Sequence, residues 1–148
     1  MGSVRDLAGR RQLIDRIESL SPDSRRLWGE MSVGEMVAHI SDAIRVALRD
    51  VPVESARGPG RFAVVRYLMI HLVRWPKGRL TAAPEMLTAD PTDLESDRST
   101  LIELLERFAE APPDTPAQVH PLLGRMTPHD WDALTHRHLE HHLRQFGV

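Results

Sequence analysis

The chain has 148 residues, enough for one hydrophobic core, and we expect residues 1–148 to form a single domain. The formal net charge of −2 and the isoelectric point near 6.4 argue against a nucleic-acid-binding protein. The absence of cysteine excludes disulfides and thiolate metal ligands, so any thiol chemistry requires a thiol from outside the chain.

The N-terminal residues are charged and no apolar core follows them, which argues against a secretory signal. The longest apolar run, residues 62–73, is interrupted by Arg66 and His71 and is too short and too polar to cross a membrane. We therefore expect a cytoplasmic protein without a membrane partner.

Periodic apolar residues predict two helices in the first fifty residues, over residues 4–20 and from Ser32 to about residue 50. Ser32 and Glu35 have the spacing of a capping box at the start of the second helix. His39 lies on the flank of that helix's apolar stripe. Such a position is more typical of a half-exposed histidine than of a ligand, although it suits a third ligand in a groove between helices.

The middle of the chain is expected to contain one unusual helix between loops. After a loop at residues 51–61, residues 62–75 are apolar on nearly all sides, which indicates a central position or a subunit interface. A buried strand is the alternative for this run. Residues 76–93 form a long irregular stretch, and long loops often cover functional sites.

A further helix is predicted over residues 94–111, with Ser96 or Asp97 as alternative caps, followed by a loop at residues 112–126. Strand-like alternation is nearly absent, so no sheet is expected. Four or five helices without a sheet predict an all-α protein, an antiparallel four-helix bundle with an extra short helix possible in a loop.

The last helix begins with Thr127 as cap, Pro128 at its first position and Asp130 in a capping box. His138 and His142 lie in the middle of its apolar face, one turn apart, so their rings can converge on a single cation. The alternative is a pair of hydrogen-bonded core residues. Two adjacent buried rings are harder to satisfy that way, because each needs both a donor and an acceptor.

Two segments resemble the DinB/YfiT-like superfamily of metal-dependent four-helix-bundle enzymes, and within it a bacterial family of unknown function. They are WGEMSVGEMVAHI at residues 28–40 and HPLLGRMTPHDWDALTHRHLEHHLRQF at residues 120–146. The resemblance implies metal ligands at His39, His138 and His142. It also implies that His141 lies beside the ligands without being one. His136 points to the opposite side of its helix.

Three neutral imidazoles leave open positions on Zn(II), Ni(II) or Fe(II), where the metal polarises a bound water or a substrate oxygen or sulfur. Asp42 and Glu35 are candidate catalytic carboxylates near the ligands, and Gln145 is a candidate hydrogen-bond partner. Both carboxylates are more typical of solvated helix charges than of catalytic groups. Because the ligands must be neutral, metal affinity should collapse below about pH 6.

Two functions remain open on this basis. The first is a metal-dependent enzyme, a thiol-dependent transferase or a hydrolase acting on an unknown small molecule. An external low-molecular-weight thiol could place its carboxylates against arginines such as Arg45 or Arg49. The second is a non-catalytic bundle, stapled by metal or free of it, that acts as a binding or assembly protein and forms a homodimer through residues 62–75.

Overall fold

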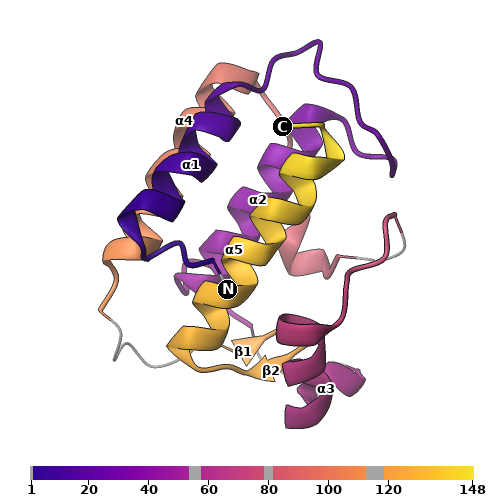
Figure 1. Cartoon of the computed structure of the whole chain (residues 1–148), viewed down its shortest axis with the longest axis vertical. Helices are drawn as coiled ribbons and strands as arrows, with labels where there is room; N and C mark the ends of the chain where they lie inside the picture. The colour runs from indigo at the N-terminus through magenta and orange to yellow at the C-terminus, as the bar shows by residue number, and fades with distance from the viewer. Residues whose placement is uncertain (1, 54–57, 79–81, 113–118) are drawn as a thin grey trace.

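The computed structural model describes residues 2–53, 58–78, 82–112 and 119–148, so parts of the three predicted loops, at 54–57, 79–81 and 113–118, lie outside the described residues. The described chain is mostly helical (Figure 1). Its elements are α1 (Leu7–Glu18), α2 (Val33–Ala47), η1 (Pro59–Arg61), α3 (Ala63–Tyr67), η2 (Leu68–Leu72), η3 (Pro84–Met86), α4 (Leu94–Glu110), β1 (Val119–His120), β2 (Gly124–Arg125) and α5 (Pro128–Gln145).

The starts of the helices follow local hydrogen bonding. Both predicted capping boxes are confirmed, at Ser32 for α2 and at Thr127 for α5. The first helix begins later than predicted, because Asp6 caps α1 by accepting the N–H of Gly9. The fourth predicted helix does begin at Leu94, but its cap is Asp93, so the alternatives at Ser96 and Asp97 are wrong.

The four long helices pack together, with α2 and α1 each against both α4 and α5 (Figure 1). Arg98, in the first turns of α4, donates to the carbonyl of Glu18 at the end of α1 (2.6 Å), so these two helices are antiparallel. Arg107, near the end of α4, pairs with Asp50 just after α2 (3.1 Å), so α2 and α4 run in the same direction. The expectation of antiparallel neighbours is therefore wrong for this pair. The described residues 82–93 run back along α2 before α4 begins, from Asp42, which binds Thr88, to Gly34, which lies against Pro91.

A two-stranded antiparallel sheet precedes α5, in contrast to the expected absence of strands. Its turn does not depend on alternating side chains. The Nδ1 atom of His120 accepts the backbone N–H groups of Leu122 and Leu123 at 3.0 and 3.1 Å, and Gly124 closes the turn with φ +75°. A side chain that binds its own turn is not detectable as strand periodicity.

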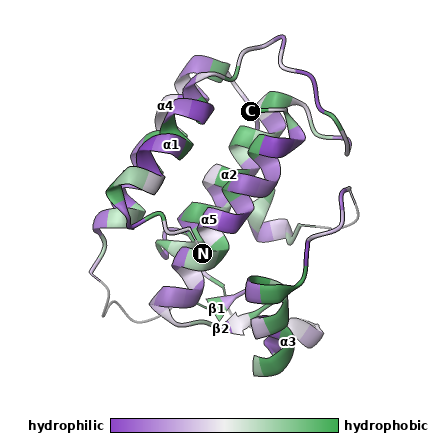
Figure 2. Ribbon diagram, viewed as in Figure 1, coloured by the Kyte–Doolittle hydropathy of each residue, from purple (hydrophilic) through white to green (hydrophobic). Residues whose placement is uncertain are grey.

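The segment formed by α3 and η2 is short and largely exposed, so its predicted central position is wrong. Val64 is 72 % exposed and Leu72 is 64 % exposed, whereas Ile70 is buried. This segment lies beside the hairpin at one end of the long helices rather than among them (Figure 1). Figure 2 shows that much of the ribbon around α3 has the green of hydrophobic residues.

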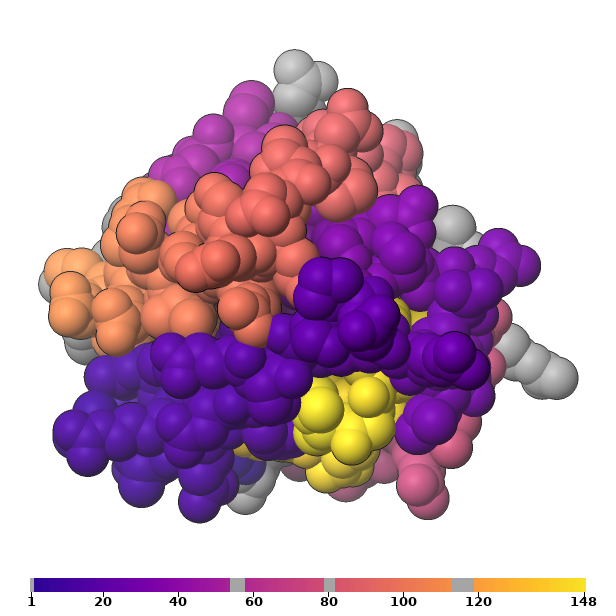
Figure 3. Space-filling model, turned by 90° about the horizontal axis from the view of Figure 1, so that it is seen from above, coloured from indigo at the N-terminus to yellow at the C-terminus, as the bar shows by residue number. Residues whose placement is uncertain are grey.

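The core is formed by the inward faces of the long helices, and α2 contributes the largest share of buried side chains. Seen from the end where α5 terminates, the C-terminal residues reach the surface between segments of the first fifty residues (Figure 3). Within the described residues, no helix combines the length and the apolar character needed to cross a bilayer.

Candidate metal centre

The histidine cluster forms where α2 and α5 pack side by side. α2 contributes His39, and α5 contributes His138 and His142 from one face. One ring nitrogen from each lies within 4.8 Å of the others, and the Nε2 atoms of His39 and His138 are 2.9 Å apart. The three side chains brought together are those that the resemblance implied, and this cluster could hold a metal ion.

The ring of His39 is fixed by a backbone carbonyl. Its Nδ1 atom lies 2.8 Å from the carbonyl oxygen of Met86. A carbonyl can only accept, so Nδ1 must carry the proton and the neutral ring presents the Nε2 lone pair to the other histidines. A hydrogen bond of this kind selects the tautomer that a metal ligand requires.

The ring of His142 is fixed in the same way by Gln145. The Nδ1 atom of His142 lies 2.7 Å from Gln145 Oε1. The amide orientation is determined independently, because Gln145 Nε2 donates to the carbonyl of Trp28 at 2.8 Å. His142 therefore donates from Nδ1 and also presents Nε2 towards the cluster. The predicted contribution of Gln145 beside the ligands is present as a hydrogen bond.

His138 completes the cluster from a largely buried position, with its ring 5.9 Å from that of Trp75. Its Nε2 faces the Nε2 lone pair of His39, and two bare lone pairs repel at 2.9 Å. Either a proton or a cation must lie between them. Nitrogen ligands about 2.0–2.1 Å from a tetrahedral zinc ion are about 3.3 Å apart. The His39–His138 pair is already close to this spacing, whereas the widest pair of the cluster, which lies within 4.8 Å, would have to move closer together around the ion.

All three rings are held in their neutral form by their surroundings. Burial lowers the pKa of His39, although the Met86 carbonyl and the Asp42 charge oppose this effect. Burial also lowers the pKa of His142 to about 3 and that of His138 well below its usual value, with neighbouring histidines adding to the His138 shift. Neutral imidazole is the form that binds metal, so the cluster does not need to lose protons near pH 7.

Asp42 is not a solvated helix charge, since it is only 1 % exposed. Its Oδ2 accepts from Thr88 N (2.6 Å), Thr88 Oγ1 (3.0 Å) and Ala89 N (2.7 Å), and its Oδ1 accepts from Arg45 (2.9 Å). Asp42 thus binds the segment that directly follows Met86, whose carbonyl orients His39. It acts on the cluster by positioning this segment.

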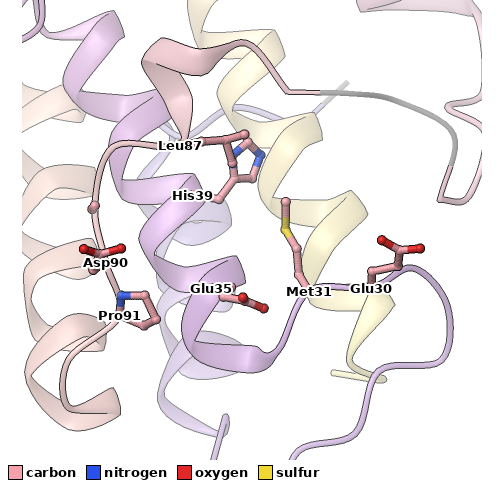
Figure 4. Close-up of a pocket in the computed structure, with 8 residues that line it drawn as sticks. Glu30, Met31, Glu35, His39, Leu87, Asp90 and Pro91 are labelled. Carbon is pink, nitrogen blue, oxygen red and sulfur yellow. The ribbon is translucent and has the colours of Figure 1, made fainter.

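Glu35, the other candidate carboxylate, is exposed, and its Oε2 accepts the N–H of Ser32 in the capping box at 2.7 Å. The capping interaction lowers the pKa of Glu35. Glu35 also lines a cleft of about 320 Å³ that borders His39 (Figure 4). The other residues around this cleft are Glu30, Met31, Leu87, Ala89, Asp90 and Pro91.

The remaining histidines of α5 lie outside the cluster. His141 packs between the rings of Trp28 (6.0 Å) and Trp75 (5.6 Å). His129 stacks on His71, and His136 contacts the N-terminal segment near Gly2.

Sequence reasoning missed the Met86 carbonyl and the residues that line the cleft beside His39 and Glu35. Met86 acts through its backbone, so no side-chain pattern could have indicated it. The cleft combines residues of two separate loops, which no local spacing connects.

The sequence of residues 6–147 matches the family described as protein of unknown function (DUF1569). No curated protein and no solved structure matches the chain. The match covers nearly the whole chain, including both helices that carry the histidine cluster, and the protein belongs to the DUF1569 family.

Proposed function

We propose that this protein is a metal-dependent enzyme of the DinB/YfiT-like type, with its four long helices arranged as that bundle. His39, His138 and His142 would hold one divalent ion. The observation that carries this proposal is the convergence of the three ring nitrogens, two of them oriented from behind by the Met86 carbonyl and by Gln145.

The open side of the cluster favours catalysis over a purely structural metal. Three protein ligands leave at least one position of the ion free, and such an ion acts as a Lewis acid on water or on a substrate oxygen or sulfur. His39 lines the cleft, so a small molecule can approach the cluster from that side. Zn(II), Ni(II) and Fe(II) all suit an imidazole site.

Between the two reaction types, the surroundings favour hydrolysis of a small-molecule substrate. A transferase would need an external thiol, because the chain has no cysteine. The described residues that line the cleft include no arginine or lysine to bind the carboxylates of such a thiol. Arg45 is already paired with Asp42, so it is a poor partner for that cofactor.

The test is the metal content of tag-free protein, purified without a nickel column and measured by mass spectrometry. We expect about one metal per chain in the parent protein and none in His39→Ala or His138→Ala. His141→Ala and His136→Ala are matched controls that should retain the metal, since neither ring belongs to the cluster. Full metal content in His39→Ala would rule out the site between the helices.

A second candidate function rests on the exposed apolar side chains of α3 and η2. In this alternative the protein is a dimeric binding or assembly protein, and any metal only staples α2 to α5. X-ray absorption spectroscopy separates the two functions. A fourth protein ligand on the metal would favour the stapling role, whereas an exchangeable water would favour catalysis.

A further inference from the structure

The charged side chains that line the cleft beside His39 are all acidic. Three of its lining side chains are carboxylates, Glu30, Glu35 and Asp90, and none of the described lining residues is an arginine or a lysine. Figure 4 shows Glu30 and Asp90 on opposite sides of the cleft, with Glu35 between them. A negative wall around a concave site raises the local concentration of cations and disfavours anions.

Two of these carboxylates have no competing partner. Glu30 and Asp90 make no hydrogen bond or ion pair with any other described residue, and both are exposed. Glu35 uses one oxygen in the capping box, and the nearby Arg26, which helps to lower its pKa, donates to the carbonyl of Gly29. Arg26 therefore offsets part of the Glu35 charge, whereas the charges of Glu30 and Asp90 are not paired within the described chain.

One wall of the cleft is held in place, before any ligand binds, by the same Asp42 hydrogen bonds that position the segment behind His39. Asp42 fixes Thr88 and Ala89, which lie between Leu87 and Asp90 in the chain. Pro91 packs tightly on α2, because a β-carbon at Gly34 would lie 3.1 Å from its ring. A wall fixed at several points needs little ordering when a ligand binds.

The opposite wall is fixed by Gln145. Leu27 donates its N–H to the Gln145 carbonyl at 2.7 Å, and the Gln145 side chain binds both the Trp28 carbonyl and His142. Glu30 and Met31, which line this side of the cleft, follow Trp28 after one intervening glycine. The same glutamine therefore orients a metal ligand and supports this side of the cleft.

We propose that the cleft binds the positively charged end of a small organic substrate, an ammonium group, between Glu30, Glu35 and Asp90. Its carbon body would lie against Met31 and Leu87, which supply the apolar part of the lining. This inference rests on the proposed function, because a divalent ion at the histidines repels the ammonium group. The reactive end of the substrate would therefore face the metal and its charged end the carboxylates.

The test compares probes of similar shape and different charge by NMR titration of ¹⁵N-labelled protein, both as purified and after chelation. The probes are benzylamine, benzyl alcohol and benzoate, with benzyltrimethylammonium as a cation that has no lone pair to donate to a metal. The test variant is Glu30→Gln/Asp90→Asn. Its matched control is Glu103→Gln/Glu106→Gln, which removes the same charge from exposed positions of α4.

We expect both cations to shift the amide resonances around residues 30–35 and 87–91 and to bind more tightly than benzyl alcohol, with benzoate weakest. The test variant should weaken benzylamine binding roughly threefold to tenfold, as expected for two partly exposed ion pairs, and the control should not. Equal binding of the cations and benzyl alcohol would overturn the proposal. So would a test variant that takes up zinc more slowly but binds benzylamine like the parent, because the carboxylates would then serve the metal alone.

The metal content of the same samples separates this proposal from the proposed function. Stoichiometric metal without selective cation binding overturns only the substrate class. Selective cation binding in a protein that takes up no metal would instead overturn the metal centre and leave a cation-binding cleft.

Discussion

Two regions of the molecule depart in opposite ways from the usual distribution of side chains. One is the seam, the contact between α2 and α5 that carries the histidine cluster, and the other is the segment formed by α3 and η2. The seam buries polar groups, including His39, Asp42 and Gln145, each with hydrogen-bond partners. The segment leaves large apolar groups exposed, such as Val64 and Leu72. Scattered exposed apolar residues are common, but a contiguous group of them on one short helix is less so.

The two regions differ in what they need in order to be stable: the seam needs hydrogen-bond partners for its buried polar groups, and the α3–η2 segment needs a cover for its apolar side chains. Burying polar groups costs free energy unless every donor and acceptor is satisfied, and the seam satisfies them in an arrangement that directs lone pairs to one point. Its organisation is complete within one chain, apart from the ion. The α3–η2 surface lacks a covering layer, which is why we relate it to a second copy of the chain. The predictions below test these two interpretations.

The largest expected effect is stabilisation by metal. At a zinc concentration about 1,000 times the dissociation constant, binding to the folded state alone adds about 4 kcal/mol to the free energy of unfolding. Thermal denaturation with and without zinc should show this gain in the parent and in His136→Ala, and little of it in His142→Ala. An equal gain in His142→Ala would mean that zinc binds elsewhere.

Loss of the Asp42 carboxylate should be the next largest effect. Asp42→Ala removes the buried carboxylate that accepts the N–H groups of Thr88 and Ala89, and we expect a loss of about 3 kcal/mol in stability, together with weaker metal binding because the Met86 segment is released. Asp50→Ala, which removes an exposed ion pair with Arg107, should cost less than about 1 kcal/mol. Urea denaturation measures both, and comparable losses would show that Asp42 has no special role.

Acid should destabilise the metal-free protein through His120. Burial lowers the pKa of this ring to about 4, below the value near 6.5 expected in the unfolded chain. The unfolded state therefore binds the proton first. The contribution of His120 is complete above pH 6.5 and falls by about 2 kcal/mol between pH 6.5 and 5. Urea denaturation across this range, compared with His120→Gln, should show a shallower decline in the variant, and parallel curves would contradict the prediction.

The smallest effect on folding is expected on the α3–η2 surface. Val64→Ser/Leu72→Ser should change the free energy of unfolding of the monomer by less than about 0.5 kcal/mol, because both side chains are exposed. If this surface joins two copies, the same variant should weaken the dimer at least tenfold in sedimentation equilibrium. Leu7→Ser, at another exposed apolar position on α1, is the control that should leave the mass unchanged. A parent protein that stays monomeric would remove the dimer proposal.

The sequence by itself determined the features that depend on neighbouring residues. The starts of α2 and α5 were predictable because capping boxes join residues three positions apart. The placement of His138 and His142 on one face follows from helical geometry alone. His39 was not distinguishable from an ordinary flank histidine by spacing, and only the family resemblance indicated it.

Tertiary structure decided everything that depends on the path of the chain between the helices. The return of the described residues 82–93 along α2 sets the direction of α4 and brings the Met86 carbonyl to His39. It also brings Asp90 opposite Glu30 across the cleft, and α3 lies at one end of the long helices. Periodicity reports which face of an element is apolar. It contains no information about which distant backbone carbonyl, loop or second chain will cover that face, because those contacts arise only when the elements pack.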